Sequence, residues 1–168
     1  KIKNKKIGRV ELLDDKIAKI SKKHKIPEDD ARQIVKNNID FYKLVEKYKK
    51  IDTKFLAQIL TSMPKEIKKR YNLECNPLDH ESVLKKLNSG LITKEAVLEI
   101  FVLLTQGKKV NFSKFKPFND KDIKKVVEKI VKKNKGAPIG ALMGMAMQEL
   151  RGKCDGKKVM EIIKKLSN

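Results

Sequence analysis

Apolar positions along this chain recur at helical spacing, in runs separated by residues that start helices. Several of these runs follow a capping residue or a proline, namely Asp14, Pro27, Asp52, Thr93 and Asn119. No stretch of any length alternates apolar and polar residues as a half-buried strand does. The pattern predicts an all-α protein, with helices over about 14–25, 27–37, 39–49, 52–62, 64–72, 80–90, 93–107, 119–136, 138–150 and 156–166.

The pattern also divides the chain into three parts. Residues 1–13 are basic and lack periodicity, so we expect a poorly ordered linker, or the last strand of a missing upstream domain. The chain begins with Lys1 rather than methionine, which suggests a fragment. Residues 14–110 form a helical bundle, and residues 111–168 form a small tail domain of three helices. The boundary falls within 108–119, which contains Pro117 and has no helical period.

Three aromatic residues lie within that boundary segment: Phe112, Phe115 and Phe118. They either pin the linker onto a neighbouring helix or offer aromatic contacts to RNA between Lys114 and Lys116. The sequence leaves both interpretations open.

Two glycines, Gly140 and Gly144, interrupt the helix expected after Pro138 and fall on one face of it. Each costs roughly 1 kcal/mol relative to alanine in a helix interior, so a close approach should compensate for them. Another helix of the same protein is the simpler explanation. The alternative is the backbone of a binding partner.

Charge is the second strong signal. The chain has 41 Lys+Arg against 21 Asp+Glu, a net charge of +20, and residues 113–168 carry 15 of these cations against 6 acids. A polyanion is the natural partner, although basic surfaces also bind membranes and acidic proteins, and lysine richness can reflect genome composition. With no Trp, 3 Tyr and 6 Phe, recognition of folded RNA by phosphate and shape is favoured over base stacking.

The densest group of cations surrounds the turn before the last expected helix, which Asp155 is placed to cap. A helix N-terminus adds a partial positive charge and free N–H groups, so this turn is a candidate phosphate site. The candidate phosphate contacts are the cations of this turn and those that end an earlier helix: Arg151, Lys153, Lys157, Lys158, Lys132, Lys133 and Lys135.

No catalytic or metal-binding constellation is recognisable. His24 and His80 stand far apart, without the cysteine or carboxylate neighbours of a metal site, so we expect surface or capping roles for them. Cys75 and Cys154 show no pairing pattern, which favours small, apolar side chains in a reducing, cytoplasmic setting. No phosphate-binding loop motif occurs, and no apolar run approaches the ~20 residues that span a bilayer.

Two stretches resemble the GatB/YqeY domain family. Residues 136–166, GAPIGALMGMAMQELRGKCDGKKVMEIIKKL, are similar to that family's C-terminal tail, and residues 80–108, HESVLKKLNSGLITKEAVLEIFVLLTQGK, to its preceding helical hairpin. The tail is most similar to the archaeal GatE branch, with the bacterial GatB branch as the alternative. The resemblance implies an all-helical bundle followed by a three-helix tail.

The resemblance also implies a function. A region of this kind would contact the outer corner of tRNA(Gln) near its D-loop and position misacylated Glu-tRNA(Gln) for an ATP-dependent amidotransferase. A missing upstream domain would use ATP and Mg²⁺, and a GatD-like amidase partner would supply ammonia. We expect no catalytic residue, cofactor or metal in the chain itself.

The leading hypothesis is therefore tRNA binding through the seven tail cations together with Gly140 and Gly144. Two rivals remain. A basic protein-docking module would use the glycine face to receive a partner helix, with lysines serving solubility. A stand-alone regulator of the YqeY kind is disfavoured by the fragment-like start.

Overall fold

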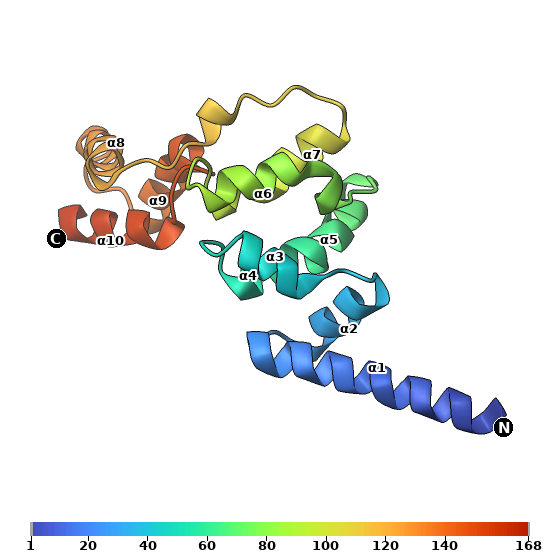
Figure 1. Cartoon of the computed structure of the whole chain (residues 1–168). Helices are drawn as coiled ribbons and strands as arrows, with labels where there is room; N and C mark the ends of the chain where they lie inside the picture. The colour runs from blue at the N-terminus through green and yellow to red at the C-terminus, as the bar shows by residue number, and fades with distance from the viewer. Residues whose placement is uncertain (1, 168) are drawn as a thin grey trace. The chain divides into compact units, whose positions relative to one another are not determined.

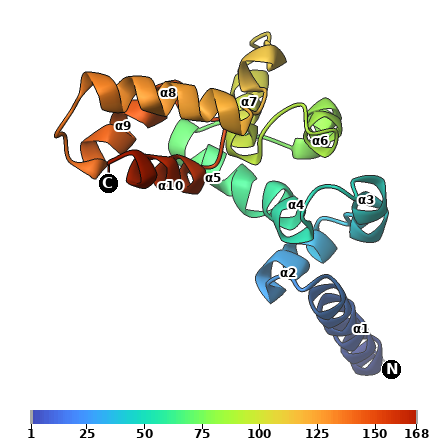
Figure 2. The same cartoon turned by 90° about the vertical axis from the view of Figure 1, so that its left-hand side faces the viewer.

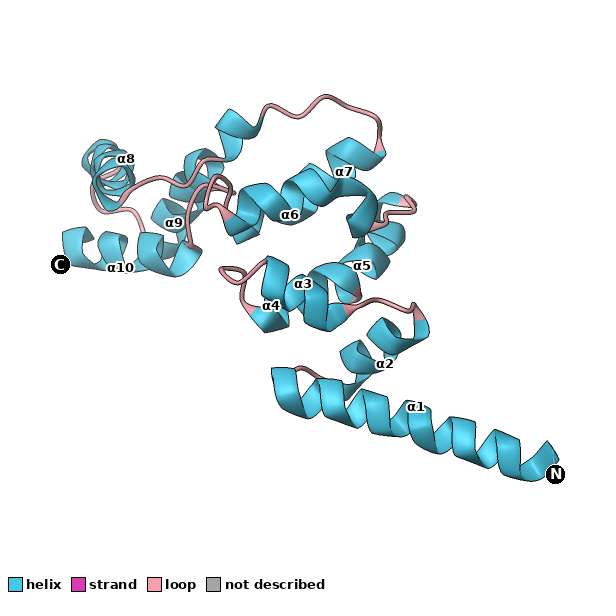
Figure 3. Cartoon of the chain, viewed as in Figure 1, coloured by secondary structure: helices cyan, strands magenta, loops and turns pink. Residues whose placement is uncertain are grey.

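The computed structural model describes residues 2–167, with side chains from residue 12 onward. Every regular element within this range is a helix, and no residue in it belongs to a strand, which confirms the all-α prediction (Figure 3). The chain divides into two compact units, Lys1–Asn88 and Ser89–Asn168.

The first unit contains six α-helices and one short 3₁₀ helix (Figure 1). They are α1 (Ile2–His24), α2 (Glu28–Lys36), α3 (Phe41–Lys47), α4 (Thr53–Leu60), α5 (Ser62–Tyr71), η1 (Pro77–His80) and α6 (Glu81–Asn88). The second unit contains η2 (Lys94–Ala96), α7 (Val97–Thr105), η3 (Phe112–Phe115), α8 (Asp120–Lys133), α9 (Ile139–Leu150) and α10 (Gly156–Ser167).

Helix α1 begins much earlier than the pattern predicts. The expected start at Asp14 is wrong, because the helix already runs from Ile2, and the alternative of an upstream strand is wrong as well. The first thirteen residues contain no proline and are rich in lysine, which has a good helix propensity. A helix nucleated by packing farther along can extend through such residues at little cost, although they show no apolar stripe. Their assignment as an interdomain linker stays a prediction.

Packing in the first unit begins where α1 meets α2. Ile17 and Ile20 of α1 and Ile34 of α2 are buried there. Pro27 precedes the first residue of α2, as predicted, and three acids follow in the first turn, where the helix dipole favours them. The side chain of Asp52 caps α4 by accepting the N–H of Phe55 at 2.9 Å, which confirms the predicted cap.

Helix α5 begins at Ser62, two residues before the proline that was expected to start it. The break between α4 and α5 lies at Thr61, which has φ −123° and ψ −71°. The buried hydroxyl of Thr61 is within hydrogen-bond distance of two acceptors, Asp30 Oδ1 at 2.7 Å and the Ala57 carbonyl at 2.8 Å. Pro64 is tolerated because it lies in the first turn of α5, where its missing N–H would have no helical partner.

A polar cluster joins α3 to α6. The phenol of Tyr48, whose residue is 2% exposed, donates to Glu81 Oε1 at 2.9 Å, and the ammonium of Lys47 bonds the same carboxylate. Lys85 lies 3.4 Å from the other oxygen of Glu81. These donors stabilise the ionised carboxylate, with the Lys47 bond as the largest cause, and they lower the pKa of Glu81 from 4.5 to about 2.

The second unit starts at Ser89, whereas the sequence placed the boundary within 108–119. A long-range contact joins the start of this unit to the tail. The hydroxyl of Thr93 donates to the carbonyl of Gly152. The side chain of Ala96 also lies beside this glycine, 3.8 Å from the position that a Cβ of residue 152 would take. Thr93 does not cap the following helix as predicted, because its side chain makes this bond instead. The segment before α7 therefore belongs with the tail.

Candidate nucleic-acid interface

The tail is a three-helix bundle formed by α8, α9 and α10, as the sequence predicts (Figure 2). One face of each helix supplies its core, with Cys154 from the turn: Ile123, Val127, Ile130, Leu142, Ala146, Leu150, Cys154, Val159 and Ile163. The N-termini of α8 and α10 meet at one end, where Lys158 Nζ lies 2.7 Å from Asp120 Oδ1. The end of α9 and the turn after it lie at that same end of the bundle.

The backbone of this turn is held from two sides. Gly152 adopts a left-handed φ of +74°, and a Cβ at this position would lie 3.8 Å from the Cβ of Ala96. The carbonyl of Gly152 accepts the Thr93 hydroxyl, and the carbonyl of Lys153 accepts the N–H of Phe118 at 2.8 Å. The turn is thus a fixed platform for the side chains that it carries.

The aromatic residues of the preceding linker take part in this platform. Phe118 packs against the tail core, and the ammonium of Lys153 lies 4.8 Å from the centroid of its ring. Phe115 reaches to 4.0 Å of the Cβ position of Gly152. Of the two interpretations of these rings, the pinning of the linker onto the tail is therefore confirmed for Phe115 and Phe118.

The four cations of the turn are not equivalent. Arg151 and Lys157 are exposed and have no partner among the described residues. Lys153 is half-buried over Phe118, and Lys158 is paired with Asp120, whose hydrogen bond raises the pKa of the lysine. Arg151 and Lys157 are thus the cations of this turn that are free for a ligand.

The N-terminus of α10 is less open than the sequence suggested. Asp155 caps the helix as predicted, accepting the N–H of Lys157 at 2.9 Å through its side chain and the N–H of Lys158 at 3.1 Å through its carbonyl. These donors are already satisfied, and the carboxylate places a negative charge beside them. An anion at this turn would therefore depend on side-chain cations rather than on backbone N–H groups.

The other three predicted contacts lie at the opposite end of α9. Lys132 and Lys133 end α8, and Lys135 follows in the next turn; all three are exposed, with no partner in the described part of the chain. Helix α9 has 12 residues, which at 1.5 Å per residue separates its ends by about 18 Å. The seven cations therefore form two groups rather than one, here called the turn cations (Arg151, Lys153, Lys157, Lys158) and the α8-end cations (Lys132, Lys133, Lys135).

Gly140 and Gly144 lie on the exposed side of α9, between these two groups. A Cβ built on either glycine meets nothing within 4 Å. The prediction that another helix of the chain packs closely on them is wrong for the described structure. Ile139 and Met145 of the same helix are each 38% exposed. The alternative, close approach by a partner, stays a prediction.

Two lysines outside the predicted set also belong near the turn. Lys114 and Lys116 are exposed, and they flank Phe115 in the linker that runs beside Gly152 and Lys153. The sequence signal was present in the KFK pattern. Without the contact from Phe118 to Lys153, however, nothing in the local pattern linked these lysines to the turn.

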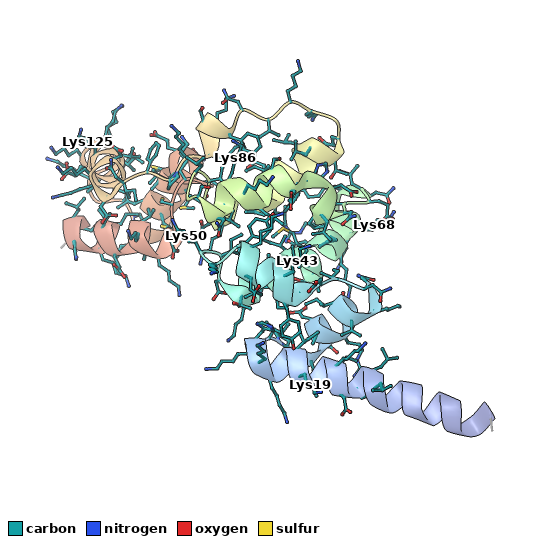
Figure 4. The ribbon with its side chains drawn as sticks, in the orientation of Figure 1. Lys19, Lys43, Lys50, Lys68, Lys86 and Lys125 are labelled. Atoms are coloured by element: carbon teal, nitrogen blue, oxygen red, sulfur yellow. The ribbon has the colours of Figure 1, made fainter. Side chains whose placement is uncertain are left out.

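Cationic side chains are otherwise widely spread. Figure 4 labels lysines on α1, α3, α5, α6 and α8, and in the segment after α3, so abundance alone marks no site. Some are neutralised, as where Lys68 pairs with Glu74 at 2.7 Å. What distinguishes the tail is the excess of cations over acids in its sequence.

His24 and Cys154 serve packing. His24 packs edge-on against the rings of Phe41 and Tyr42, with centroids 5.1 and 5.0 Å away, rather than in the surface or capping role expected for it. Burial lowers its pKa, and Lys23 adds to this. Burial likewise raises the pKa of the Cys154 thiol, with Glu95 and Asp155 adding to this, so the thiol is held in its unreactive form.

These features define a helical domain with a strongly basic three-helix tail. The family model of the GatB domain matches residues 39–166, and the chain belongs to that family. The E subunit of glutamyl-tRNA(Gln) amidotransferase from Methanocaldococcus jannaschii is 30% identical over 92% of this chain, which covers 27% of that relative.

The E subunits of the same amidotransferase from Methanococcus maripaludis and Sulfurisphaera tokodaii are 28% and 30% identical over 92% and 74% of this chain, covering 27% and 22% of their own lengths. These matches confirm the resemblance to the family and to its GatE branch, where the chain corresponds to the C-terminal region. The chain spans about a quarter of the length of these relatives. No solved structure matches it. Across the described residues, no helix combines the length and apolar character needed to cross a membrane.

Proposed function

We propose that this chain is the tRNA-binding region of a glutamyl-tRNA(Gln) amidotransferase and that its tail grips the tRNA through phosphate contacts. The turn cations and the α8-end cations would contact the phosphates. The uncharged face of α9 between them, which carries Gly140 and Gly144, would let the RNA backbone approach closely. The resemblance favours the outer corner of tRNA(Gln), near the D-loop, as the element bound. The protein would thereby hold misacylated Glu-tRNA(Gln) for conversion to Gln-tRNA(Gln).

The observation that carries this proposal is the set of exposed cations without partners around a fixed turn. Arg151 and Lys157 stand on a backbone that Thr93 and Phe118 hold in place. A backbone that is already fixed loses little conformational entropy when phosphates bind, so phosphate contacts at these positions contribute more to the binding free energy. The names of the relatives supply the tRNA as the polyanion.

The rest of the reaction belongs, in this proposal, to parts of the protein outside this chain. An upstream domain would activate the glutamyl group with ATP and Mg²⁺. A GatD-like amidase partner would release ammonia. The present chain would hold the tRNA in place and would take no part in the chemical steps.

Charge reversal of the two free turn cations tests the site. Arg151→Glu combined with Lys157→Glu should weaken binding of a tRNA(Gln) transcript, and the salt dependence of its association constant should become shallower by about one unit of slope for each phosphate that is no longer neutralised. Fluorescence anisotropy over a salt series measures both quantities. Both residues are exposed, so the helicity of the chain should not change.

Lys65→Glu combined with Lys69→Glu is the matched control. These lysines are exposed on α5, outside the tail, and the net charge changes by the same amount. If the control weakens binding as much as the turn variant does, binding follows total charge and the proposed site is refuted. Comparison with other tRNAs then tests the preference for tRNA(Gln).

A protein-docking module is the second candidate. The open glycines of α9 favour it, because small residues on one helix face allow the close approach of a helix from another protein. Such a contact would be nearly indifferent to salt, whereas RNA binding weakens steeply as salt rises.

A further inference from the structure

A separate groove lies in the first unit, between α1 and the segment from α2 to α3. Its volume is about 390 Å³, and its lining combines apolar side chains with two lysines and one amide: Leu13, Lys16, Lys19, Ile20, Val35, Asn38, Ile39 and Tyr42. Neither the tRNA proposal nor the family resemblance uses this groove.

Several apolar groups in and beside the groove face solvent. Leu13 is 47% exposed and Tyr42 is 37% exposed, while Val35 and Ile39 are half-buried below them. Leu12, beside Leu13 on α1, is 62% exposed. Large apolar side chains gathered in a concave site indicate a binding surface more strongly than the same residues scattered singly.

The charged side chains that line the groove are positive. Lys16 and Lys19 line it, and no carboxylate does among the described residues. A groove of the tail, between α8 and α10, differs in this respect because Asp120 and Glu161 line it together with its lysines. A ligand for the groove of the first unit therefore needs negative charge beside an apolar surface.

These two requirements select the occupant. A second copy of this chain is disfavoured, because each copy carries a net charge of +20. An RNA backbone would leave the apolar floor without a match, since its phosphates need donors rather than Leu13 and Val35. We propose that the groove docks an acidic amphipathic helix of another protein, with leucine-like side chains on the floor and carboxylates at Lys16 and Lys19.

Binding of a designed probe tests this. The probe is a fluorescein-labelled helical peptide of about 18 residues, with leucines at i, i+3, i+4 and i+7 and glutamates elsewhere. Amide NMR shifts of the chain on peptide addition should concentrate on α1, α2 and α3. Leu13→Ser should weaken the peptide about tenfold through lost apolar burial. Lys16→Glu combined with Lys19→Glu should weaken it at least as much, with a loss that shrinks at high salt.

The controls separate this site from the tRNA surface. Leu13→Ser should leave the affinity for tRNA(Gln) unchanged, because RNA gains nothing from an apolar floor. Lys125→Glu combined with Lys129→Glu should leave peptide affinity within about twofold, since these lysines are far from the groove in sequence and lie in the other unit. Because Leu13 is half-exposed while Ile17 and Ile20 form the core, its replacement should preserve the circular dichroism spectrum.

Three results would overturn the proposal. The peptide could shift the residues of the α8–α10 groove instead, or Leu13→Ser could leave its affinity unchanged. Finally, tRNA or anionic vesicles could displace the peptide, and Leu13→Ser could change how strongly they do so. That result would assign the groove to a nucleic acid or a lipid surface.

Discussion

Replacing the two exposed glycines of α9 with alanine should stabilise the tail. A methyl group at Gly140 or Gly144 meets no atom within 4 Å, so the change carries no steric cost. A glycine in a helix interior costs roughly 0.8–1.0 kcal/mol relative to alanine. Gly144 is such a position, whereas Gly140 is the second residue of α9 and gains less, so we expect about 1 kcal/mol for Gly140→Ala combined with Gly144→Ala. A gain of this size should slow amide exchange of the buried α9 residues about fivefold where they exchange through opening of the tail.

Native-state hydrogen exchange resolved on α9 is the appropriate assay, because it reports the tail apart from the first unit. Faster exchange in the double variant would show that other groups cover these positions. The conclusion that Gly140 and Gly144 lie on an open face of α9 would then be wrong. The same variant separates stability from binding. If a partner's backbone rests on the glycines, affinity for tRNA(Gln) falls while stability rises, whereas unchanged affinity would remove them from the interface.

Three further perturbations have defined outcomes. Gly152→Ala should destabilise the second unit by about 1–2 kcal/mol, because its φ of +74° is unfavourable for a residue with a Cβ, and urea unfolding would measure this. The folded-state pKa of Glu81 is depressed to about 2, so the stability from its bonds to Tyr48 and Lys47 should be complete above pH 4.5 and decline as pH falls toward 2; Glu81→Gln should flatten that decline in acid titrations. Thr61→Val should cost about 1–3 kcal/mol in thermal unfolding, because the buried Asp30 loses a hydrogen-bond partner, and an unchanged midpoint would contradict the buried bond.

Local signals predicted most of the fold. Asp52, Asn119 and Asp155 each accept a backbone N–H from the first turn of the helix that was expected to follow them, at 2.9, 2.8 and 2.9 Å. Such caps involve residues within three positions of one another, so the sequence contains all the information needed. The apolar stripes of α8 and α10 were predictable for the same reason.

Interactions between distant residues were beyond the pattern. The bond from Thr93 to Gly152 joins the segment before α7 to the tail, and the bond from Phe118 to Lys153 brings Lys114 and Lys116 to the turn. A hydroxyl just before a helical run is interpreted as a cap, because its distant partner has no mark in the sequence. The candidate site itself stays a prediction, and the structure places its two groups of cations at opposite ends of α9.

The tie between Thr93 and Gly152 determines where the tail can be excised as an autonomous piece. A recombinant fragment starting near Lys108 would lack both the hydroxyl that holds the Gly152 carbonyl and the Ala96 methyl that shields this glycine. A fragment starting at Ser89 retains both. We expect the longer fragment to give the better-dispersed NMR spectrum, because Thr93 and Ala96, which precede α7, hold the turn that carries Arg151 together with Phe118.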